Sequence, residues 1–164
     1  MAQSINGMIA RRNGSEDFLS DANWQTFSSL AKQHQCVIVG RKTYEAVSKW
    51  QEYNFDSIKA HKIVVSKKKK ISKRAGYTSV TSPQAALTQA KRLGYHNIIL
   101  AGGAKLNFSF LKARKVNQII LNINPYLLGA GIPLCLSKPL ELRLKLLRTK
   151  KITSQIIQLQ YQVI

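Results

Sequence analysis

The strongest constraint on the fold is a recurring pattern, in which a short apolar run ends at Gly or a small polar residue and a helix or loop follows. Cys36–Val39, Lys62–Val65 and Asn97–Ala101 are runs of this kind, and each is followed by Gly or Ser. Strands that alternate with helices are typical of α/β proteins, in which the crossovers make neighbouring strands parallel. The pattern therefore predicts an α/β fold whose mostly parallel central sheet carries helices on both faces.

The other segments complete this arrangement. Ser20 suits an N-cap, and apolar residues follow it at helical spacing. Pro83 suits the first turn of another helix, which Gly94 would end. Ser154–Ile164 alternates between apolar and polar side chains, mostly glutamine, and this predicts an antiparallel strand in an edge hairpin. Further strands are predicted at Met1–Ile5, Met8–Ile9, Tyr77–Val80 and Val116–Ile123, and short helices at Thr43–Trp50 and Leu106–Lys112.

Charge is the unusual part of the composition. Lys and Arg together number 26 against 7 acidic residues in a chain of 164, which gives a net charge of +19. A field of this sign attracts polyanions and phosphorylated small molecules, but it does not specify a fold. The length, together with the lack of a repeat or a Pro/Gly-rich linker, predicts one domain over residues 1–164.

Several classes of protein receive no support from the sequence. No apolar stretch approaches the ~18 residues of a membrane span, and the first residues do not resemble a secretory signal. Cys36 and Cys135 lie among apolar neighbours and are expected to be buried, reduced thiols. The His and Cys residues lack the spacing of a zinc site. We therefore expect a cytoplasmic protein without a metal.

Three of the strand ends have features that suit phosphate groups. Gly40–Thr43 and Gly102–Lys105 combine cations with glycine, which lets the backbone approach a ligand closely. Ser66 is followed by the run Lys67–Lys70. Helix N-termini present unpaired N–H groups, and ligands of open α/β sheets bind at carboxyl strand ends. These turns therefore predict a site for a dinucleotide with an extra 2′-phosphate, although the chain has neither a P-loop nor a G-x-G-x-x-G fingerprint.

Four segments, in chain order, carry a likeness to a known family. They are SINGMIA at Ser4–Ala10, VIVGRKTYE at Val37–Glu45, ILAGGAKL at Ile99–Leu106 and PYLLGAGIPL at Pro125–Leu134. Together they resemble the dihydrofolate reductase superfamily. The fourth is similar to the reductase domain of riboflavin biosynthesis, the C-terminal part of a deaminase-reductase. Gln155–Tyr161 fits the last strand of that fold, so the likeness covers nearly the whole chain.

The resemblance implies a dihydrofolate-reductase-like fold, NADPH as the cofactor, and an activity as an oxidoreductase. It also assigns residues to the cofactor by their position in the motifs. These are Gly40, Arg41, Lys42 and Thr43 for the phosphates, Ser66 and Lys67 for the adenosine 2′-phosphate, Gly102, Gly103, Ala104, Lys105 and Leu106 for the pyrophosphate, and Ala2, Ile9 and Ala10 for the nicotinamide.

The chain departs from the family pattern at three places. It begins almost inside the first motif, which indicates either a different start or an altered pocket wall. Asn6 stands where Asp is usual, and Asn23 stands at the position of the family carboxylate on the first helix. An amide can hold a heterocycle by hydrogen bonds but cannot titrate. If the family role persists, Asn23 orients the substrate and water delivers the proton. Asp21, the nearest carboxylate, would point about 200° away from Asn23 on a helix.

The candidate substrate is a ribosylamino-pyrimidine phosphate, or a pterin or dihydrofolate-like ring. The catalytic candidates are Asn23 and Asp21, and the substrate-binding candidates are Ser4, Asn6, Trp24, Phe27, Asn122 and Tyr126. The spacing of Trp24 and Phe27 also suits a buried core. By resemblance the chain would be a homodimer.

Two other functions compete with the reductase. In one, the fold is kept, catalysis is weakened, and the basic surface, including Lys67–Arg74, binds nucleic acid; no known nucleic-acid motif supports this. In the other, Leu140–Lys151 lies on a membrane surface. The alternation of leucine with basic residues in that segment suits a strand better than an interfacial helix, so no membrane partner is expected.

Overall fold

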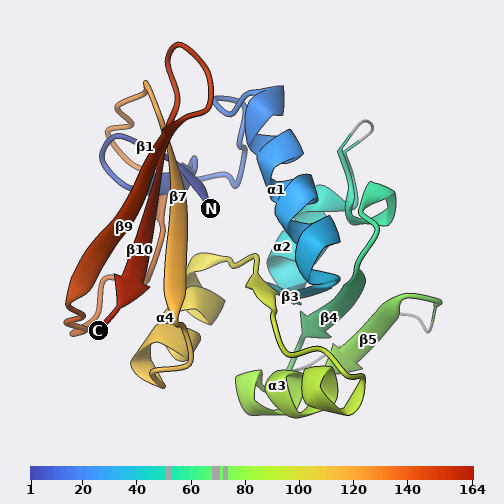
Figure 1. Cartoon of the computed structure of the whole chain (residues 1–164). Helices are drawn as coiled ribbons and strands as arrows, with labels where there is room; N and C mark the ends of the chain where they lie inside the picture. Colours follow the sequence, from blue (N-terminus) through green and yellow to red (C-terminus); the bar gives the residue numbers. More distant parts are fainter. Residues whose placement is uncertain (51–52, 68–70, 72–73) are drawn as a thin grey trace. The chain divides into compact units, whose positions relative to one another are not determined.

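The computed structural model describes residues 1–50, 53–67, 71 and 74–164, and it shows a mixed α/β protein with a parallel sheet flanked by helices (Figure 1). The chain divides into two compact units. Met1–Trp24 and Asn107–Ile164 form the terminal unit, and Gln25–Leu106 form the central unit. Each unit contains its own four-stranded sheet.

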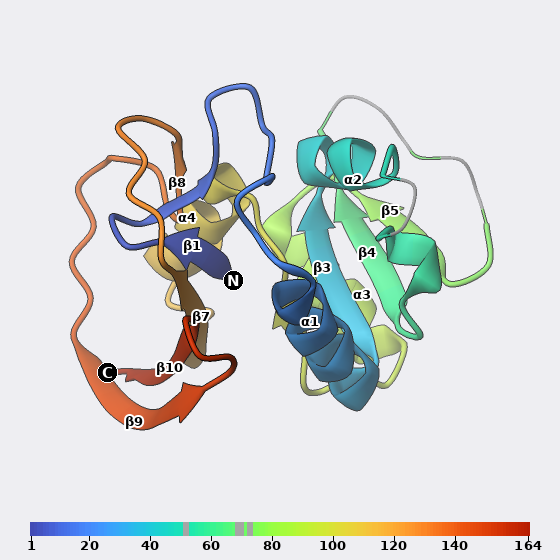
Figure 2. The ribbon, with the colours of Figure 1, turned by 90° about the horizontal axis from the view of Figure 1, so that it is seen from above.

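The central unit contains an all-parallel sheet in the order β5-β4-β3-β6. Its helices α1 and α3 lie on opposite faces of the sheet, as Figures 1 and 2 show from two directions. The bounds are α1 Asp21–His34, β3 Cys36–Gly40, α2 Arg41–Val47, the 3-10 turn η1 Phe55–Ser57, β4 His61–Val65, β5 Tyr77–Val80, α3 Pro83–Arg92 and β6 Ile99–Leu100.

The core of the central unit forms where the helices meet the two middle strands. Val37–Val39 of β3 and Ile63–Val64 of β4 are almost completely buried. The helix residues against them are small, since Ala31 of α1 and Ala86 and Ala90 of α3 are also fully buried. Apolar runs buried on both faces are the usual pattern of parallel sheets. The predicted strand-helix alternation therefore reflects how this core is built.

The terminal unit contains a mixed sheet in the order β1-β7-β10-β9 and a two-stranded ribbon of β2 and β8. β1 pairs with β7 in parallel, whereas β10 pairs with both β7 and β9 in antiparallel register. Helix α4 Ala104–Lys112 begins in the central unit and continues in the terminal unit from Asn107. The other bounds are β1 Ala2–Ser4, β2 Met8–Ala10, β7 Gln118–Asn124, β8 Ile132–Pro133, β9 Leu144–Lys151 and β10 Ile157–Val163.

The prediction from sequence was accurate for the fold class and less accurate for individual elements. The α/β class and the antiparallel pairing at the C-terminus are confirmed, and β9 forms the edge while β10 lies inside the sheet. The ribbon strand β8 and the turn η1 were not predicted. Among the described residues, no helix is both long and apolar enough to cross a membrane.

Candidate functional site

The carboxyl end of β3 runs directly into helix α2, with Gly40 as the N-cap residue. Gly40 has no side chain that could cap this helix, so the N-cap residue offers no side-chain acceptor to its first N–H groups. Gly40 itself donates its N–H to the carbonyl oxygen of Gly102 at 2.8 Å. This bond joins the predicted phosphate turn Gly40–Thr43 to the predicted turn at Gly102–Gly103.

Little space is left for side chains where these two turns meet. A Cβ on Gly103 would lie 3.1 Å from Thr43 Oγ1, and a Cβ on Gly40 would lie 3.4 Å from the carbonyl oxygen of Gly102. Gly102 has φ +85, a conformation that side chains disfavour. Because no Cβ separates the turns, their backbones pack closely, and Gly40, Thr43 and Gly103 lie together.

Helix α4 begins immediately after the second turn, with Ala104 and Leu106 buried and Lys105 exposed. Its first turn contains no acidic residue. The partial positive charge of a helix N-terminus is therefore not offset by a local carboxylate, and an anion would be favoured there.

The third strand end lies beside the first. β3 and β4 pair in parallel with Gly40 opposite Val65, so Ser66 follows one residue beyond Gly40's partner. Ser66 is buried and its N–H donates to the carbonyl oxygen of Val80 at 2.8 Å, whereas Lys67 is exposed. The predicted run continues through Lys68–Lys70, which lie outside the described residues.

The cationic side chains at these turns differ in whether an acidic residue already binds them. Arg41 Nη1 donates to Glu45 Oε2 at 2.6 Å, one helical turn along α2. Both side chains are partly exposed, so the pair is weak enough for a phosphate to compete with Glu45 for the guanidinium. Lys42 is exposed on the same turn. Packed glycine turns, an uncapped helix start and nearby cations fit the phosphates of a dinucleotide, and the residues present therefore suit NADPH.

In the terminal unit, Asn23 lies at the centre of a buried cluster of amides. Its Nδ2 donates to Asn124 Oδ1 at 2.8 Å, and Asn122 Nδ2 donates to its Oδ1 at 3.1 Å. Gln158 Nε2 donates in turn to Asn122 Oδ1 at 2.9 Å. The structure thus brings together two predicted site residues, Asn23 and Asn122, that are 99 positions apart. We name these four residues, Asn23, Asn122, Asn124 and Gln158, the amide cluster.

The hydrogen-bonding capacity of Asn23 is fully used inside the protein. Besides the two bonds above, Asn23 Nδ2 donates to Ser20 Oγ at 3.4 Å, and Asn124 Nδ2 donates to Asn23 Oδ1 at 3.5 Å. A side-chain amide offers two donor hydrogens and two acceptor lone pairs, and all four are engaged. A ligand that binds Asn23 must therefore replace one of these bonds, and the two longest are the easiest to give up.

Two residues of interest were missed at the sequence level. Asn124 is almost completely buried and belongs to the amide cluster, and the alternation Asn122-x-Asn124 on one strand face was the signal for it. Glu16, in the segment before α1, is half-buried, and desolvation raises its pKa to about 7. The raised pKa of Glu16 cannot be predicted from a single sequence, because it depends on burial by the folded chain.

Ser4 and Asn6 hold the turn between β1 and β2. Ser4 Oγ donates to Asn6 Oδ1 at 2.8 Å, and Asn6 Nδ2 donates to the carbonyl oxygen of Leu128 at 2.5 Å. Leu128 N–H returns a bond to Asn6 Oδ1 at 3.1 Å. Asn6 therefore links the first motif to the PYLLGAG segment, and Ser4 supports this link through its bond to Asn6.

The other candidates of the terminal unit lie on the β1 and β2 strands and nearby loops. Ala2 is opposite Asn122 in register, and Ile9 and Ala10 are buried on β2. Tyr126 is exposed and packs edge-on against Phe18, with ring centroids 5.8 Å apart. Asp21 is exposed in the first turn of α1.

The two aromatic candidates of α1, Trp24 and Phe27, belong to different units. Trp24 is half-buried in the terminal unit. Phe27 belongs to the central unit, where it packs edge-on against buried Phe55, with ring centroids 6.3 Å apart. Tyr44 of α2 stacks on the same ring of Phe55 at 6.2 Å. Phe27 is thus part of an aromatic core, in agreement with the simpler expectation for its spacing.

The two thiols are free, but they differ in burial. Cys36 is fully buried on β3, and burial raises its pKa to about 11. Cys135 is only half-buried, so the expectation that both thiols are buried is wrong for this one, because it lies in the loop after β8 rather than in a strand. Desolvation also raises the pKa of Cys135.

Comparison with known proteins identifies a family. The model of the family described as "RibD C-terminal domain" matches residues 1–158. In Bacillus subtilis (strain 168), the uncharacterized protein YwjB is 29% identical over 165 residues, which cover 98% of this chain and 94% of YwjB.

Solved structures show the same fold at low sequence identity. RibD of Acinetobacter baumannii superposes with a TM-score of 0.81 at 16% identity, over 100% of this chain and 56% of that one. A pyrimidine reductase-like protein of Corynebacterium diphtheriae superposes with a TM-score of 0.77 at 14% identity, over 99% of this chain and 89% of that one.

Proposed function

We propose that this chain, which belongs to the RibD C-terminal domain family, is an NADPH-dependent reductase that transfers hydride to a pyrimidine- or pterin-type heterocycle. The observation that carries the proposal is the convergence of the β3 and β6 ends, where Gly40, Gly102 and Gly103 pack without side chains beside two helix starts. Such a cradle suits a ligand with several phosphates, and NADPH is the cofactor that the family resemblance implies.

In this proposal the phosphates of NADPH bind at the three strand ends, where Lys42 and Lys67 supply charge. NADPH supplies the hydride when it is bound. The residues proposed to hold it are the ones assigned by motif: Gly40, Arg41, Lys42, Thr43, Ser66, Lys67, Gly102, Gly103, Ala104, Lys105 and Leu106 for the phosphates, and Ala2, Ile9 and Ala10 for the nicotinamide.

The amide cluster is proposed to orient the heterocycle through hydrogen bonds. Asn23 would exchange its 3.4 Å bond to Ser20, or the 3.5 Å bond from Asn124, for one to the substrate. Because an amide does not titrate, water delivers the proton that the reduced ring nitrogen needs. The substrate is either a ribosylamino-pyrimidine phosphate or a dihydrofolate-like ring, in line with the basic charge of the chain.

Cofactor selectivity provides the direct test. Purified protein is titrated with NADPH and with NADH at low and moderate salt, and binding is followed by tryptophan fluorescence. We expect NADPH to bind more tightly, and Lys67→Gln to weaken NADPH about tenfold with little effect on NADH. Lys91→Gln, an exposed α3 lysine, is the control for loss of one charge. Absence of NADPH binding at low salt would reject the proposal.

The substrate is then identified by NADPH oxidation, followed by absorbance, with dihydrofolate in one reaction and the diaminopyrimidine ribosyl phosphate in another. Oxidation in one reaction alone would assign the substrate class. Binding of NADPH without oxidation in either reaction would keep the cofactor proposal and reject both substrates.

A second candidate function is favoured by the surface of β9. All eight residues of this edge strand are exposed, and Lys145, Arg148, Lys150 and Lys151 make it strongly basic. A weakened reductase could bind nucleic acid here, with affinity that falls steeply with salt. Electrophoretic mobility shifts at increasing salt test this alternative. We also propose a cytoplasmic location and a homodimer, and analytical ultracentrifugation tests the dimer.

A further inference from the structure

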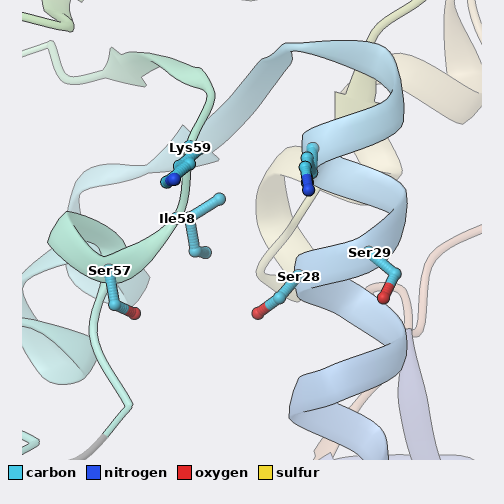
Figure 3. Close-up of a pocket in the computed structure, with 6 residues that line it drawn as sticks. Ser28, Ser29, Ser57, Ile58 and Lys59 are labelled. Carbon is cyan, nitrogen blue, oxygen red and sulfur yellow. The ribbon is translucent and has the colours of Figure 1, made fainter.

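A pocket of about 260 Å³ lies in the central unit between α1 and the segment from η1 to β4 (Figure 3). The hydroxyl oxygen of Ser28 is closed to solvent there, and Ser57 Oγ already donates to the carbonyl oxygen of Asn54 at 2.8 Å. The two lysines of the lining are exposed. The lining residues are Ser28, Ser29, Lys32, Ser57, Ile58 and Lys59. This pocket therefore offers a ligand mainly surface cations.

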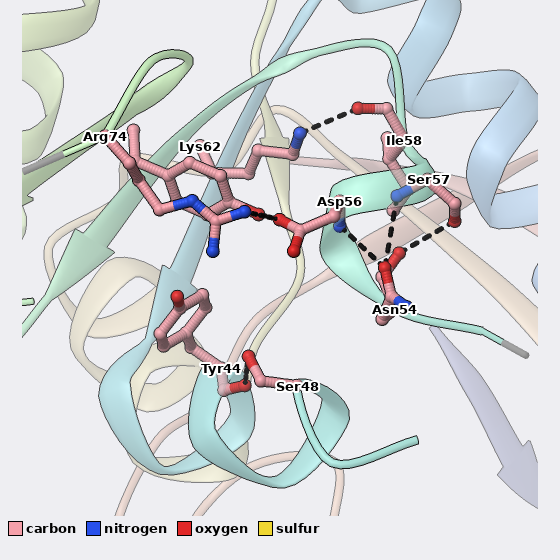
Figure 4. Close-up of polar contacts among 9 residues, drawn as sticks. Tyr44, Ser48, Asn54, Asp56, Ser57, Ile58, Lys62 and Arg74 are labelled. Carbon is pink, nitrogen blue, oxygen red and sulfur yellow. Dashed lines mark hydrogen bonds and ion pairs between the residues drawn. The ribbon is translucent and has the colours of Figure 1, made fainter. Parts of the chain in front are cut away.

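The polar side chains beside the pocket bind one another (Figure 4). Asn54 accepts from the N–H groups of Asp56 and Ser57. The guanidinium of Arg74 and the hydroxyl of Tyr77 both donate to the carboxylate of Asp56. These bonds use the polar groups within the fold and leave little hydrogen-bonding capacity for a ligand.

The amide cluster of the terminal unit differs, because its hydrogen bonds form a chain with a fixed direction. Asn124 Nδ2 donates to the backbone carbonyl oxygens of Gln3 at 3.1 Å and Asn122 at 3.3 Å, and a carbonyl can only accept. The side-chain oxygen of Asn124 must therefore accept from Asn23 Nδ2, and Asn23 Oδ1 accepts in turn from Asn122 Nδ2. The chain ends where Gln158 Nε2 donates to Asn122 Oδ1 at 2.9 Å.

The unused hydrogen-bonding capacity of the cluster lies at the Gln158 end. Asn23, Asn122 and Asn124 are almost completely buried, whereas Gln158 is half-buried. Among the described residues, the side chain of Gln158 makes one hydrogen bond, through its nitrogen. A side-chain amide has two donor hydrogens and an oxygen with two lone pairs. Gln158 therefore keeps its oxygen and one N–H for a ligand.

We infer that Gln158 is a specificity-determining residue that binds a heterocycle with a ring N–H next to a carbonyl. The Gln158 oxygen would accept from the ring N–H, and its remaining N–H would donate to the ring carbonyl. Pyrimidinediones and pterins both have such an edge. The link of this contact to reduction rests on the proposed function. Unlike Asn23, Gln158 can bind the ring without giving up a bond that the fold already makes.

The probe for this contact is lumazine, a fluorescent pteridinedione that has the required ring edge and needs no cofactor. Its matched partner is 1,3-dimethyllumazine, in which methyl groups replace both ring N–H hydrogens and both carbonyls remain. Titration of the whole chain with each compound, followed by fluorescence, measures the preference for a ring N–H. We expect the wild type to prefer lumazine about tenfold.

Gln158→Met keeps the length of the side chain and removes the amide, so the preference should fall to about twofold or less. Gln160→Met is the control, because Gln160 lies two residues further along β10 on the same face and donates to Gln118 Oε1 at 2.9 Å. This variant should keep the wild-type preference. An unchanged preference in Gln158→Met, or an equal loss in Gln160→Met, would overturn the inference.

The ratio of the two affinities separates ring recognition from a structural role. Gln158→Met also leaves Asn122 Oδ1 without its donor, so some stability is lost, and urea unfolding measures this loss. A purely structural role would weaken both compounds in equal proportion and leave the ratio unchanged. The wild-type comparison needs no variant. Equal affinity for the two compounds, or no binding of lumazine, would therefore overturn the inference even if Gln158→Met did not fold.

Kinetics connects the contact to the proposed reduction. With a heterocycle that the protein reduces, Gln158→Met should raise KM severalfold and change kcat little, because the lost bond forms already in the bound ground state. An unchanged KM would contradict the role of Gln158 in binding the substrate. If NADPH does not bind at all, the proposed function fails, but the two lumazine titrations still decide whether Gln158 recognises the ring.

Discussion

Replacing Glu16 by glutamine tests whether burial controls the pH dependence of stability. The carboxyl is half-buried in the segment before α1, and desolvation raises its pKa from an ordinary 4.5 to about 7. A raised pKa means that the folded chain holds the proton more tightly than the unfolded chain does. The contribution of Glu16 is thus fully favourable below pH 4.5 and is lost as the pH rises through about 7.

The size of the effect follows from the shift in pKa. Each unit corresponds to about 1.4 kcal/mol, so the ionised Glu16 costs the folded state about 3 kcal/mol above pH 7.5. Glutamine imitates the protonated carboxyl in shape and cannot ionise. We therefore expect Glu16→Gln to match the wild type near pH 4.5 and to be more stable by up to about 3 kcal/mol at pH 8.

Urea unfolding of both proteins between pH 4.5 and 8 measures the difference. Asp17→Asn is the control, because Asp17 is exposed and the bonds from Arg11 and Ser15 lower its pKa to about 2. Its contribution is present above its ordinary pKa and is lost only as the pH falls toward 2, so its effect should be constant from pH 5 to 8. A difference between Glu16→Gln and wild type that does not change with pH would refute the burial argument.

Three further substitutions have expected outcomes. Gly103→Ala places a Cβ 3.1 Å from Thr43 Oγ1, so the melting temperature should fall, and adding Thr43→Ala should restore it; no recovery would place the strain elsewhere. Asn23→Leu leaves its buried amide partners unpaired and should cost about 2–4 kcal/mol in urea unfolding, whereas Gln160→Ala on a more exposed amide pair should cost under about 0.5 kcal/mol. Phe55→Ala removes a buried ring and should cost about 3–5 kcal/mol; a loss below 1 kcal/mol in thermal unfolding would contradict its place in the core.

The strand ends were accessible from sequence because local chemistry determines them. An apolar run that stops at Gly40 or Gly102 marks both the end of a strand and a backbone that can approach a ligand, and neither property needs tertiary information. Asn23 and Asn122 were each found singly, through motif position and strand position. That they are hydrogen-bonded to one another is a property of the fold alone.

The features that sequence reasoning missed depend on tertiary placement. The pocket joins Ser28 on α1 to Ser57 on η1, and neither serine has a neighbouring residue that distinguishes it from a solvated hydroxyl. The raised pKa of Glu16 and the half-exposure of Cys135 also arise from how distant segments cover them. β8 is only two residues long, and its glycine- and proline-containing surroundings give no periodic signal.

The side-chain amide of Asn23 matches the hydrogen-bonding groups of its neighbours. Its partners are amides, which donate and accept in equal number and so satisfy one another without charge. A carboxylate there would accept only, would face Asn124 Oδ1 where Asn23 Nδ2 now donates at 2.8 Å, and would pay the cost of burying a charge. The amide cluster therefore keeps its hydrogen bonds at any pH at which the fold is stable. For the proposed reduction, this separates orientation of the ring by the amide cluster from delivery of the proton by water.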